Sequence, residues 1–597
     1  MAMNVAFVVL SAGGLALALK LRPSLGDATI HGLAGRADAA DIVFDDTMAH
    51  LRTLHRDGIA IVGLCAAGIL IRALAPLLDD KQTDAPVIAL AEDGSVAVPL
   101  IGGHHGANEL ARQLAAACGG VAAVTTAGDL RFGFSLDDPP PEWRIANPEG
   151  VKPVTAALLS GEGARLDVEA GVAAWLDDAP WRADATARVL VTDRNPDLEP
   201  QTLVLHPPVI AIGVGCERDT APSELIALVT QTLQEAGIAP GAIAAIGSLE
   251  LKMDEPAVHR VAAALNAPAR FFTAAALEAE APRLLTPSNL VFRETGCHGV
   301  AEGAALALAG PEAELIVPKR KSRRATCAIA RARGDIDPTR KGMARGVLSV
   351  VGIGPGDPVW RSPDATAAIQ SAEFIVGYDR YLDLIDGVAR RAERRGYGLG
   401  QEAARVRDAL TLAGEGHRVA LVCSGDAGIY ALASLVFEMV ESNADPLWRR
   451  AEITVAPGIT AMQAAAARAG APIGHDFCAI SLSDLLTSRD VIIRRLNASA
   501  AGDFVTALYN PQSERRRDLL VHAQKIFLES RPPSTPVVIA RNLGRDDETT
   551  LIVPLSDMDV DAVDMLTIVI IGNSQTRMLQ LSDGVRAYTP RGYGVEP

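Results

Sequence analysis

The chain has 597 residues, enough for about three or four ordinary domains. Hydrophobic residues make up 49% and charged residues 21%, a balance that excludes a disordered chain, and aromatic residues make up only 4%. The net charge of −16 argues against nucleic acid as a partner, and seven cysteines without a CxxC pair predict reduced thiols and no zinc site.

The first apolar run, Val5 to Leu19, has the character of a signal peptide or a membrane helix. No Lys or Arg precedes it, it is shorter than the roughly 18 residues that a membrane helix needs, and Ser11–Gly14 interrupts it. We therefore predict a buried strand at Val5–Leu10, a glycine turn and a helix at Leu15–Leu21. No membrane association is expected.

The stretch from residue 4 to about 130 has an α/β pattern. Gly58–Leu78 predicts a strand, a turn at Cys65–Gly68 and a helix that reaches Arg72. Ala85–Cys118 predicts a hairpin with a turn at Asp93-Gly94, then a glycine loop and a helix from about Ala107. The loop, Gly102–Gly106, ends where a helix begins, and backbone amides at such a position favour an anion.

Two proline-rich breaks divide the next part, one at Asp137–Pro141 and one at His206–Pro208. The stretch between them is less informative and is expected to form a small middle domain. After the second break, Val209–Ile238 and Ile243–Leu265 each repeat the pattern of strand, polar loop and helix.

A glycine-rich segment, VLSVVGIGPGDP, begins at Val347. A dinucleotide-binding fold would need a helix to begin among Gly352, Gly354 and Gly356, but Pro355 and Asp357 interrupt these glycines, and proline offers no amide to a phosphate. A dehydrogenase is therefore disfavoured. In the later loop SGDAGIY, Asp426 would repel a pyrophosphate and suits a cationic or hydroxyl-rich ligand, such as a sulfonium cofactor with a ribose.

Four motifs, GIGPGD, SGDAGIY, APGITAMQAAAARAG and ALYNP, stand in an order and spacing that resemble the tetrapyrrole methyltransferase family. HDFCAISLSDLLT and ARNLGR narrow the resemblance to its precorrin-3B C(17)-methyltransferase branch, over roughly residues 346–585. The resemblance implies a two-lobed α/β fold, S-adenosylmethionine as the cofactor, methylation of a precorrin or its cobalt form at ring carbon 17 with ring contraction, and a homodimer. It places six positions around the cofactor: Pro355, Asp426, Ile429, Thr460, Ala461 and Tyr509.

Two alternatives stay open for the acidic and basic candidates in this part. Asp426 is expected to accept hydrogen bonds from the cofactor, or else to be a turn residue that bonds its own backbone. Ring contraction needs proton transfers, so His475 and Asp476 are the catalytic candidates. A histidine that merely precedes a strand explains His475 equally well.

Other motifs, among them GGHHGANELA, GVGCERDTAPSE, SLELKMDEP and ETGCHGVAEGAAL, resemble cobalt-precorrin-5A hydrolase over about residues 4–331. The implied reaction opens a lactone and releases acetaldehyde. His104 is the candidate base, and Lys81 and Arg72 are candidates to pair with substrate carboxylates, with Glu250 or Lys252 as further contributors. The shortened loop around His104 departs from the family pattern. Two alternatives stay open: the histidine only caps the following helix, or this part of the chain carries a tetrapyrrole without catalysing a reaction.

We thus predict several α/β domains: 1–136 and 207–333 like the hydrolase, 142–206 as a small middle domain, a linker at 334–345, and the methyltransferase at 346–597. The basic cluster Pro318–Gly342 is expected to be a solvated strand (Thr326–Arg331) plus linker, or else a guide for a polycarboxylate substrate. The whole is expected to be a cytoplasmic, bifunctional enzyme of corrin-ring synthesis, with no metal site.

Overall fold

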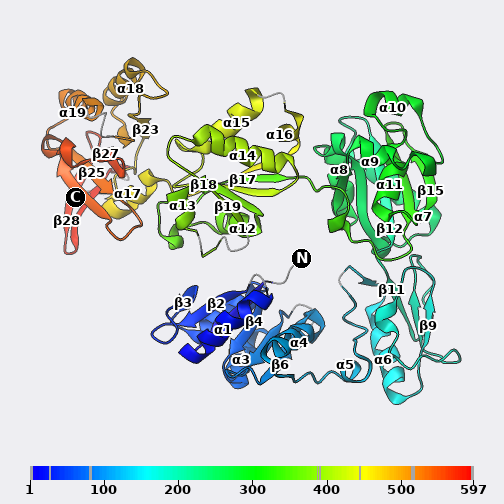
Figure 1. Cartoon of the computed structure of the whole chain (residues 1–597). Helices are drawn as coiled ribbons and strands as arrows, with labels where there is room; N and C mark the ends of the chain where they lie inside the picture. The colour runs from blue at the N-terminus through cyan, green and yellow to red at the C-terminus, as the bar shows by residue number, and fades with distance from the viewer. Residues whose placement is uncertain are drawn as a thin grey trace. The chain divides into compact units, whose positions relative to one another are not determined.

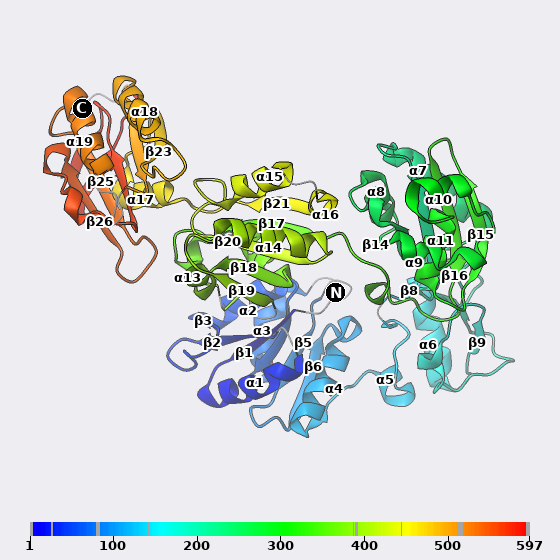
Figure 2. The same ribbon diagram turned by 45° about the horizontal axis from the view of Figure 1, so that its top comes forward.

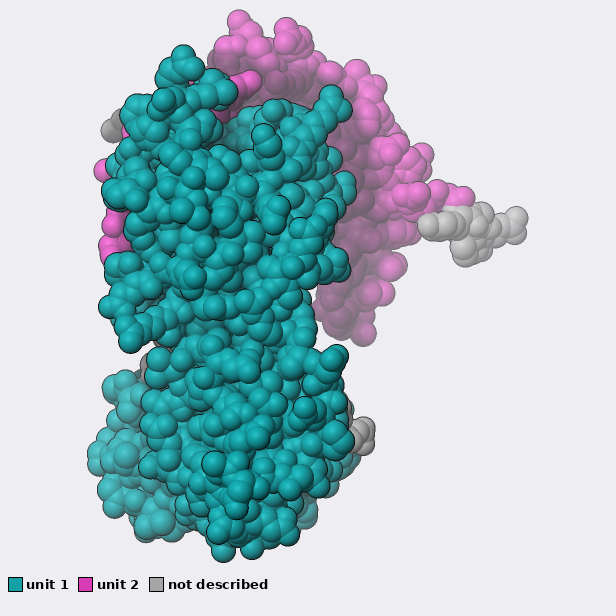
Figure 3. All heavy atoms as spheres, turned by 90° about the vertical axis from the view of Figure 1, so that its right-hand side faces the viewer, with its two compact units in different colours: residues 1–344 teal, residues 345–597 magenta. Residues whose placement is uncertain are grey.

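The structure is a computed structural model that describes residues 4–25, 28–78, 84–140, 142–385, 387–388, 392–442, 445–511 and 518–592. The chain forms two compact units, Met1–Ala344 and Arg345–Pro597 (Figure 3). Each unit is described by itself below. No helix in the described part of the chain combines the length and apolar character that crossing a membrane requires.

The first sheet has seven strands in the order β3-β2-β1-β4-β5-β6-β7 (Figure 1). Buried residues of α1 and α4 pack on one face of the sheet, and those of α2 and α3 pack on the other. The strands are β1 (Val5–Val9), β2 (Thr29–Leu33), β3 (Ile42–Phe44), β4 (Ala60–Leu64), β5 (Val87–Leu90), β6 (Val96–Ile101) and β7 (Val121–Ala122); the helices are α1 (Ala12–Leu25), α2 (Thr47–Arg56), α3 (Ala67–Leu74), α4 (Ala107–Cys118) and α5 (Ala127–Phe132).

The direction of β6 decides which loops share an edge of this sheet. The first five strands run parallel, whereas β6 runs antiparallel to β5, so that Val87 pairs with Ile101 and Leu90 with Ala97. The predicted hairpin is thereby confirmed. Its consequence is that the glycine loop after β6 lies at the edge where the parallel strands begin.

The predicted start of the first helix was wrong. We expected a glycine turn before Leu15, but α1 begins at Ala12 and takes Gly13 and Gly14 into its first turn. The hydroxyl of Ser11 accepts the amide hydrogen of Gly14 at 3.0 Å, which satisfies one of the free donors of that turn. This cap offsets part of the low helix propensity of glycine.

Two further sheets complete the first unit, in the orders β8-β11-β10-β9 and β14-β13-β12-β16-β15. Helix α11 packs directly against β12. The approach is so close that a Cβ atom at Gly213 would come within 1.9 Å of the Ala301 carbonyl. The elements are β8 (Arg144–Ile145), α6 (Val151–Ser160), β9 (Arg165–Val168), β10 (Arg188–Val191), β11 (Thr202–His206), β12 (Ile210–Cys216), α7 (Pro222–Ala236), β13 (Ile243–Leu249), α8 (Pro256–Ala264), β14 (Ala269–Phe272), α9 (Ala274–Glu278), α10 (Asn289–Thr295), α11 (Val300–Ala309), β15 (Glu314–Lys321) and β16 (Ala325–Arg331).

The basic cluster is more ordered than a solvated linker. Lys319 lies in β15, and its ammonium group donates to the Thr286 carbonyl at 2.9 Å, while Arg320 and Lys321 are exposed. Strand β16 lies between β12 and β15 rather than at an edge. The following segment packs back on the third sheet, where Met343 pairs with Phe271.

The second unit has two lobes. The first is a parallel sheet in the order β19-β18-β20-β17-β21. Only a short 3-10 turn, Pro358–Trp360, follows the glycines, and the first α-helix, α12, begins at Pro363. Its elements are β17 (Val347–Gly352), α12 (Pro363–Ser371), β18 (Phe374–Tyr378), α13 (Asp379–Asp383), β19 (Glu393–Tyr397), α14 (Glu402–Gly414), β20 (Arg418–Cys423), α15 (Leu432–Ser442), α16 (Pro446–Arg450) and β21 (Glu452–Ala456).

The second lobe holds a mixed sheet in the order β23-β24-β27-β25-β26 and a smaller sheet in the order β22-β29-β28. Figure 2 shows the larger sheet beside α17, α18 and α19. Buried residues of α17 pack on one face, and those of α18 and α19 on the other. Its elements are α17 (Ala461–Ala469), β22 (Gly470–Ala471), β23 (Phe477–Ser481), α18 (Arg489–Ala501), β24 (Val505–Tyr509), α19 (Asp518–Ser530), β25 (Pro536–Arg541), β26 (Thr549–Pro554), β27 (Thr567–Ile571), β28 (Arg577–Leu581) and β29 (Gly584–Tyr588).

Candidate functional site

Three loops of the first lobe of the second unit meet backbone to backbone. They follow β17, β20 and β21, and they touch through Gly352, Gly425 and Gly458. A Cβ atom on Gly458 would lie 2.2 Å from the Gly425 carbonyl, and one on Gly352 would lie 2.7 Å from the same oxygen. Gly425 also exchanges two backbone hydrogen bonds with Gly354, at 2.8 and 3.1 Å. Side chains at these glycines would push the three loops apart.

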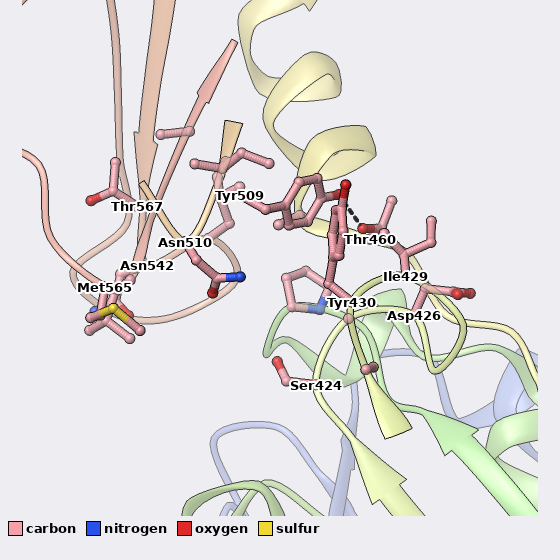
Figure 4. A pocket seen from close by; sticks show the side chains of 18 of the residues that line it. Ser424, Asp426, Ile429, Tyr430, Thr460, Tyr509, Asn510, Asn542, Met565 and Thr567 are labelled. Carbon is pink, nitrogen blue, oxygen red and sulfur yellow. Dashed lines mark hydrogen bonds between the residues drawn. The ribbon is translucent and has the colours of Figure 1, made fainter. Parts of the chain in front are cut away.

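A cavity of about 230 Å³ opens beside these loops. The six positions predicted to surround a cofactor all line it, although they come from four separate segments of the chain. Figure 4 shows most of them from close by. The six are Pro355, Asp426, Ile429, Thr460, Ala461 and Tyr509.

Asp426 combines the two interpretations that the sequence left open. Its Oδ1 accepts the amide hydrogen of Gly428 at 2.8 Å, which is a turn within its own loop. Its Oδ2 accepts the amide hydrogen of Gly458 at 3.0 Å and so ties two of the glycine loops together. A carboxylate has about four acceptor positions, so both oxygens keep room for a further donor.

Tyr509 occupies the place of a helix cap. Thr460 is the N-cap residue of α17 but makes no capping bond with its side chain. Instead, the Tyr509 hydroxyl accepts the amide hydrogen of Met462 at 3.1 Å and shares a hydrogen bond with the Thr460 hydroxyl, drawn as a dashed line in Figure 4. Burial raises the pKa of the Tyr509 phenol, which therefore stays protonated.

Three residues of the cavity wall have left-handed backbone conformations that side chains disfavour. They are Tyr430 with φ of 51°, Asn510 with 47° and Asn542 with 56°. Tyr430 is held in place by its hydroxyl, which donates to the Ala479 carbonyl at 2.9 Å, and by its ring, whose centre lies 5.1 Å from that of Tyr509. Such local strain persists where the surroundings enforce it.

Sequence reasoning missed several wall residues. The clearest is Arg545, whose Nε lacks a hydrogen-bond partner and whose Nη1 donates only a long bond of 3.4 Å to Asn542 Oδ1 among the described residues. Its motif ARNLGR was noticed only as a mark of the family. No signal in the sequence marks this arginine as unpaired, because its lack of partners arises only in the folded chain. The other missed residues include Tyr381, Ser424, Tyr430, Asn542 and Met565.

His475 and Asp476 do not line this cavity. They precede β23, and Asp476 accepts a backbone hydrogen bond from Val505 where β24 begins. The cavity lies at the other ends of these two strands, where Tyr509 ends β24. The His475 ring accepts the amide hydrogen of Asp476 on Nδ1 at 2.7 Å, and the same nitrogen lies 3.5 Å from the Asp476 carboxylate.

In the first unit, the candidates of the hydrolase-like part are less well defined. Lys81 and the side chain of His104 lie outside the described residues. The backbone at His104 forms a short 3-10 turn between Gly102 and Gly106, both left-handed, at the edge of the sheet near Pro86. Arg72 is exposed on α3. Lys252 lies 3.8 Å from the buried Glu255, and Glu250 begins the same turn.

The described residues contain no cluster of three or more metal-ligating side chains. All seven cysteines have free thiols.

Three parts of the chain match known families. Residues 347–559 match the tetrapyrrole (corrin/porphyrin) methylases, residues 210–330 the C-terminal part of cobalamin synthesis G, and residues 49–129 its N-terminal part. The second unit is therefore a tetrapyrrole methylase, a family that uses S-adenosylmethionine and acts on tetrapyrroles.

Two curated proteins are similar to the second unit along nearly their whole length. The probable cobalt-factor III C(17)-methyltransferase of Salmonella typhimurium is 42% identical over 41% of this chain and 99% of its own. The precorrin-3B C(17)-methyltransferase of a Sinorhizobium species is 41% identical over 42% of this chain and 97% of its own. The solved methyltransferase CobJ is 40% identical, covers 41% of this chain and all 100% of its own, and has a TM-score of 0.39.

The chain belongs to the family of C(17)-methyltransferases of cobalamin biosynthesis, and its first unit adds both parts of cobalamin synthesis G. Both resemblances seen in the sequence are thereby confirmed.

Proposed function

We propose that the second unit transfers a methyl group from S-adenosylmethionine to ring carbon 17 of precorrin-3B or of its cobalt form, with contraction of the ring. The observation that carries this proposal is the cavity in which the six expected cofactor positions come together. The names of the relatives supply the substrate and the position of methylation.

The residues of the cavity fit the cofactor. Pro355, Ile429 and Ala461 offer apolar surface, while Asp426 and Thr460 offer oxygens for ribose hydroxyls or an amino group. The close contact of the glycine loops leaves backbone groups at the cavity wall without side chains to cover them. We assign the six positions to the cofactor on this chemistry.

S-adenosylmethionine supplies a methyl group that is already activated as a sulfonium, so the protein needs no strong nucleophile. Its task is to hold the ring carbon and the methyl group in line at attack distance, a proximity effect. Tyr509 and Asp426 fix the loops that carry the cofactor positions. Arg545 is free to pair with a carboxylate of the tetrapyrrole. A role of His475 or Asp476 in proton transfer stays a prediction, and their place at the far ends of the strands argues against it.

The test is a mass-spectrometric assay of the full chain with S-adenosylmethionine and a precorrin-3-type substrate, with and without cobalt. We expect a gain of one methyl group, reduced at least tenfold in Asp426→Ala. No transfer to either substrate would refute the assignment, and the dependence on cobalt would tell which form is used.

We further propose that the first unit hydrolyses the lactone of cobalt-precorrin-5A and releases acetaldehyde. The two matches to cobalamin synthesis G support this proposal. The alternative is a carrier that binds a tetrapyrrole without chemistry. An acetaldehyde assay on the full chain separates the two, because a carrier binds the tetrapyrrole and releases no aldehyde.

The domain division stays a proposal: 1–136, 142–206, 207–333 and 346–597, with a linker at 334–345. Separate sheets for these four parts support it. Phe132 and Leu136 pack in the core of the middle domain, so limited proteolysis should cut before these residues rather than after them. The contacts of Met343 with Phe271 predict that the linker resists cleavage.

We also propose a cytoplasmic homodimer. Seven free thiols favour a reducing compartment. The hairpin of β28 and β29 exposes apolar side chains, among them Leu579 at 46% and Leu581 at 43%. Light scattering of a Leu579→Asp, Leu581→Asp variant should then report a monomer. A wild-type monomer would refute the dimer.

A further inference from the structure

The first sheet has a groove at the edge opposite to the loop of His104. The groove has a volume of about 390 Å³ and is lined by Cys65, Ala66, Ala67, Ala89, Leu90, Ala91, Glu92, Val96 and Val98. Cys65 to Ala67 connect β4 to α3, and Glu92 follows the end of β5. The groove therefore lies where the parallel strands β4 and β5 end.

The connections of the sheet favour a ligand at this edge. From β1 the chain continues to β2 on one side, whereas β4 pairs with β1 on the other side. The loops after β1 and β4 thus diverge at the carboxyl ends of two neighbouring parallel strands. Ligands of open α/β sheets bind in the crevice at such a point. The groove lies one strand further along the same edge, beside the ends of β4 and β5.

An acid–hydroxyl pair borders the groove. The Ser11 hydroxyl, directly after β1, donates to Glu92 Oε1 at 2.6 Å. The same hydroxyl accepts the Gly14 amide, so it is held from both sides. Glu92 is itself exposed to solvent and can exchange a proton with a ligand or with water.

The rest of the groove is apolar and flat. Val96 and Val98 of β6 remain half-buried, because α4 packs on the other face of this strand and α3 covers only part of this one. Small alanine side chains form the opposite wall. The N-cap residue of α3, Ala66, offers no side-chain oxygen to the first amides of the helix, whose positive end favours an anionic oxygen.

We propose that this groove, and not the loop that carries His104, holds the tetrapyrrole of the first unit. The proposal rests on the hydrolytic function proposed above and names its site. The edge of the macrocycle lies against the alanine and valine walls. The first amides of α3 face the carbonyl oxygen of the lactone.

Glu92 acts as the base in the groove. It takes a proton from a water molecule as the water oxygen bonds to the lactone carbonyl carbon, and negative charge passes to the carbonyl oxygen. When the ring C–O bond breaks, the leaving alkoxide takes the proton from Glu92, so that one water is consumed and a hydroxy acid is formed. The new hydroxyl then returns its proton to Glu92 as its carbon separates from the macrocycle as acetaldehyde. The electron pair of the broken C–C bond stays on the conjugated macrocycle, which takes up the proton. Cys65 is not the nucleophile, since burial and then the charge of Glu92 raise the pKa of its thiol to about 11.

Cys65 provides a readout of binding that does not depend on activity. Cys216, in the third sheet, is a matched internal control, because it is also half-buried and its thiol pKa is also raised to about 11, mainly by burial. The full chain is alkylated with N-ethylmaleimide with and without uroporphyrin III, and both peptides are followed by mass spectrometry. We expect at least tenfold slower alkylation of Cys65 and no change at Cys216.

Two variants test the groove. Ala66→Trp fills it from an exposed position and should abolish the protection of Cys65, whereas Ala75→Trp, exposed beyond the other end of α3, should not. Glu92→Gln should keep the protection but lower the rate of acetaldehyde release from cobalt-precorrin-5A about a hundredfold. Unprotected Cys65, or equal protection in Ala66→Trp, would overturn the proposal.

The aldehyde assay separates this proposal from the proposed function. If the wild-type chain releases no acetaldehyde, the hydrolytic function fails. If it releases acetaldehyde and Glu92→Gln does so at the same rate, the function stands and the groove is wrong. A loss in His104→Ala with full activity in Glu92→Gln would return the site to the glycine loop.

Discussion

The Tyr509 hydroxyl caps helix α17 in place of that helix's own N-cap residue, Thr460. The bond links the end of β24 to the segment that holds two of the proposed cofactor positions, Thr460 and Ala461. One hydroxyl group therefore connects the stability of the second lobe to the shape of the cavity.

Tyr509→Phe should lower both the unfolding free energy of the second unit and its affinity for S-adenosylmethionine. The loss of a helix cap costs about 1 kcal/mol of unfolding free energy. The freed Thr460 should also weaken the binding of S-adenosylmethionine. Denaturant unfolding and titration calorimetry measure the two effects. As a control, Tyr397→Phe removes a hydroxyl that donates to Asp408 at 2.9 Å and should leave binding unchanged. Unaltered binding in Tyr509→Phe would contradict this account.

Asp426→Asn should bind S-adenosylmethionine about ten- to a hundredfold more weakly. The amide group has one acceptor oxygen, so it cannot accept the hydrogens of Gly428 and Gly458 in the same way and still serve a ligand. Calorimetry measures the dissociation constant. The control is Asp484→Asn. Asp484 is also an acidic loop residue of the second unit, but it does not line the cavity. A change of less than twofold would show that Asp426 is a turn residue only.

Arg545→Ala should raise the KM for the tetrapyrrole and leave the dissociation constant of S-adenosylmethionine unchanged. The guanidinium of Arg545 has no ion pair among the described residues, so it is available to a substrate carboxylate. Arg541 is the matched control, because Asp547 and Asp564 already bind it at 3.1 and 2.8 Å. If Arg541→Ala raised the KM for the tetrapyrrole equally, the effect would come from the loss of a positive charge in this region and not from a contact of Arg545 with the substrate.

Gly458→Ala should destroy the cavity. Its new methyl group would lie 2.2 Å from the Gly425 carbonyl, a backbone atom that cannot move aside without moving its loop. We expect loss of cofactor binding and a large loss of stability. The control is Gly398→Ala, whose nearest neighbour is the flexible end of Gln401 at 3.4 Å. Normal binding by Gly458→Ala would refute the backbone packing described here.

His206 should make the first unit less stable in mild acid. Burial lowers the pKa of this imidazole in the folded chain, and its Nδ1 donates to the Thr192 carbonyl at 2.7 Å. Above about pH 6.5 the imidazole is mainly neutral in both states and contributes nothing. As the pH falls below that value, the unfolded chain takes up the proton first, so the folded state loses stability. His206→Asn keeps a donor and should show a weaker pH dependence of thermal unfolding.

The sequence was most informative where function depends on the backbone. Gly352, Gly425 and Gly458 lie in the three motifs GIGPGD, SGDAGIY and APGITAMQAAAARAG, which could be recognised because a loop without side chains is a local property of the sequence. The position of His104 could not be inferred in the same way. Whether its loop lies at one edge of the sheet or the other depends on the direction of β6, and therefore on a pairing with β5 rather than on the loop itself. Arg545 was missed because its lack of partners is a property of the folded chain.

The three left-handed residues of the cavity wall have a consequence for protein engineering. Each of these conformations costs of the order of 1–3 kcal/mol, so Tyr430, Asn510 and Asn542 are places where a substitution by glycine relieves the backbone. A selection for heat resistance alone should therefore find these positions early. The selected variants would be more stable to heat but have a more flexible cavity wall, so the screen should measure methyl transfer as well as thermal stability.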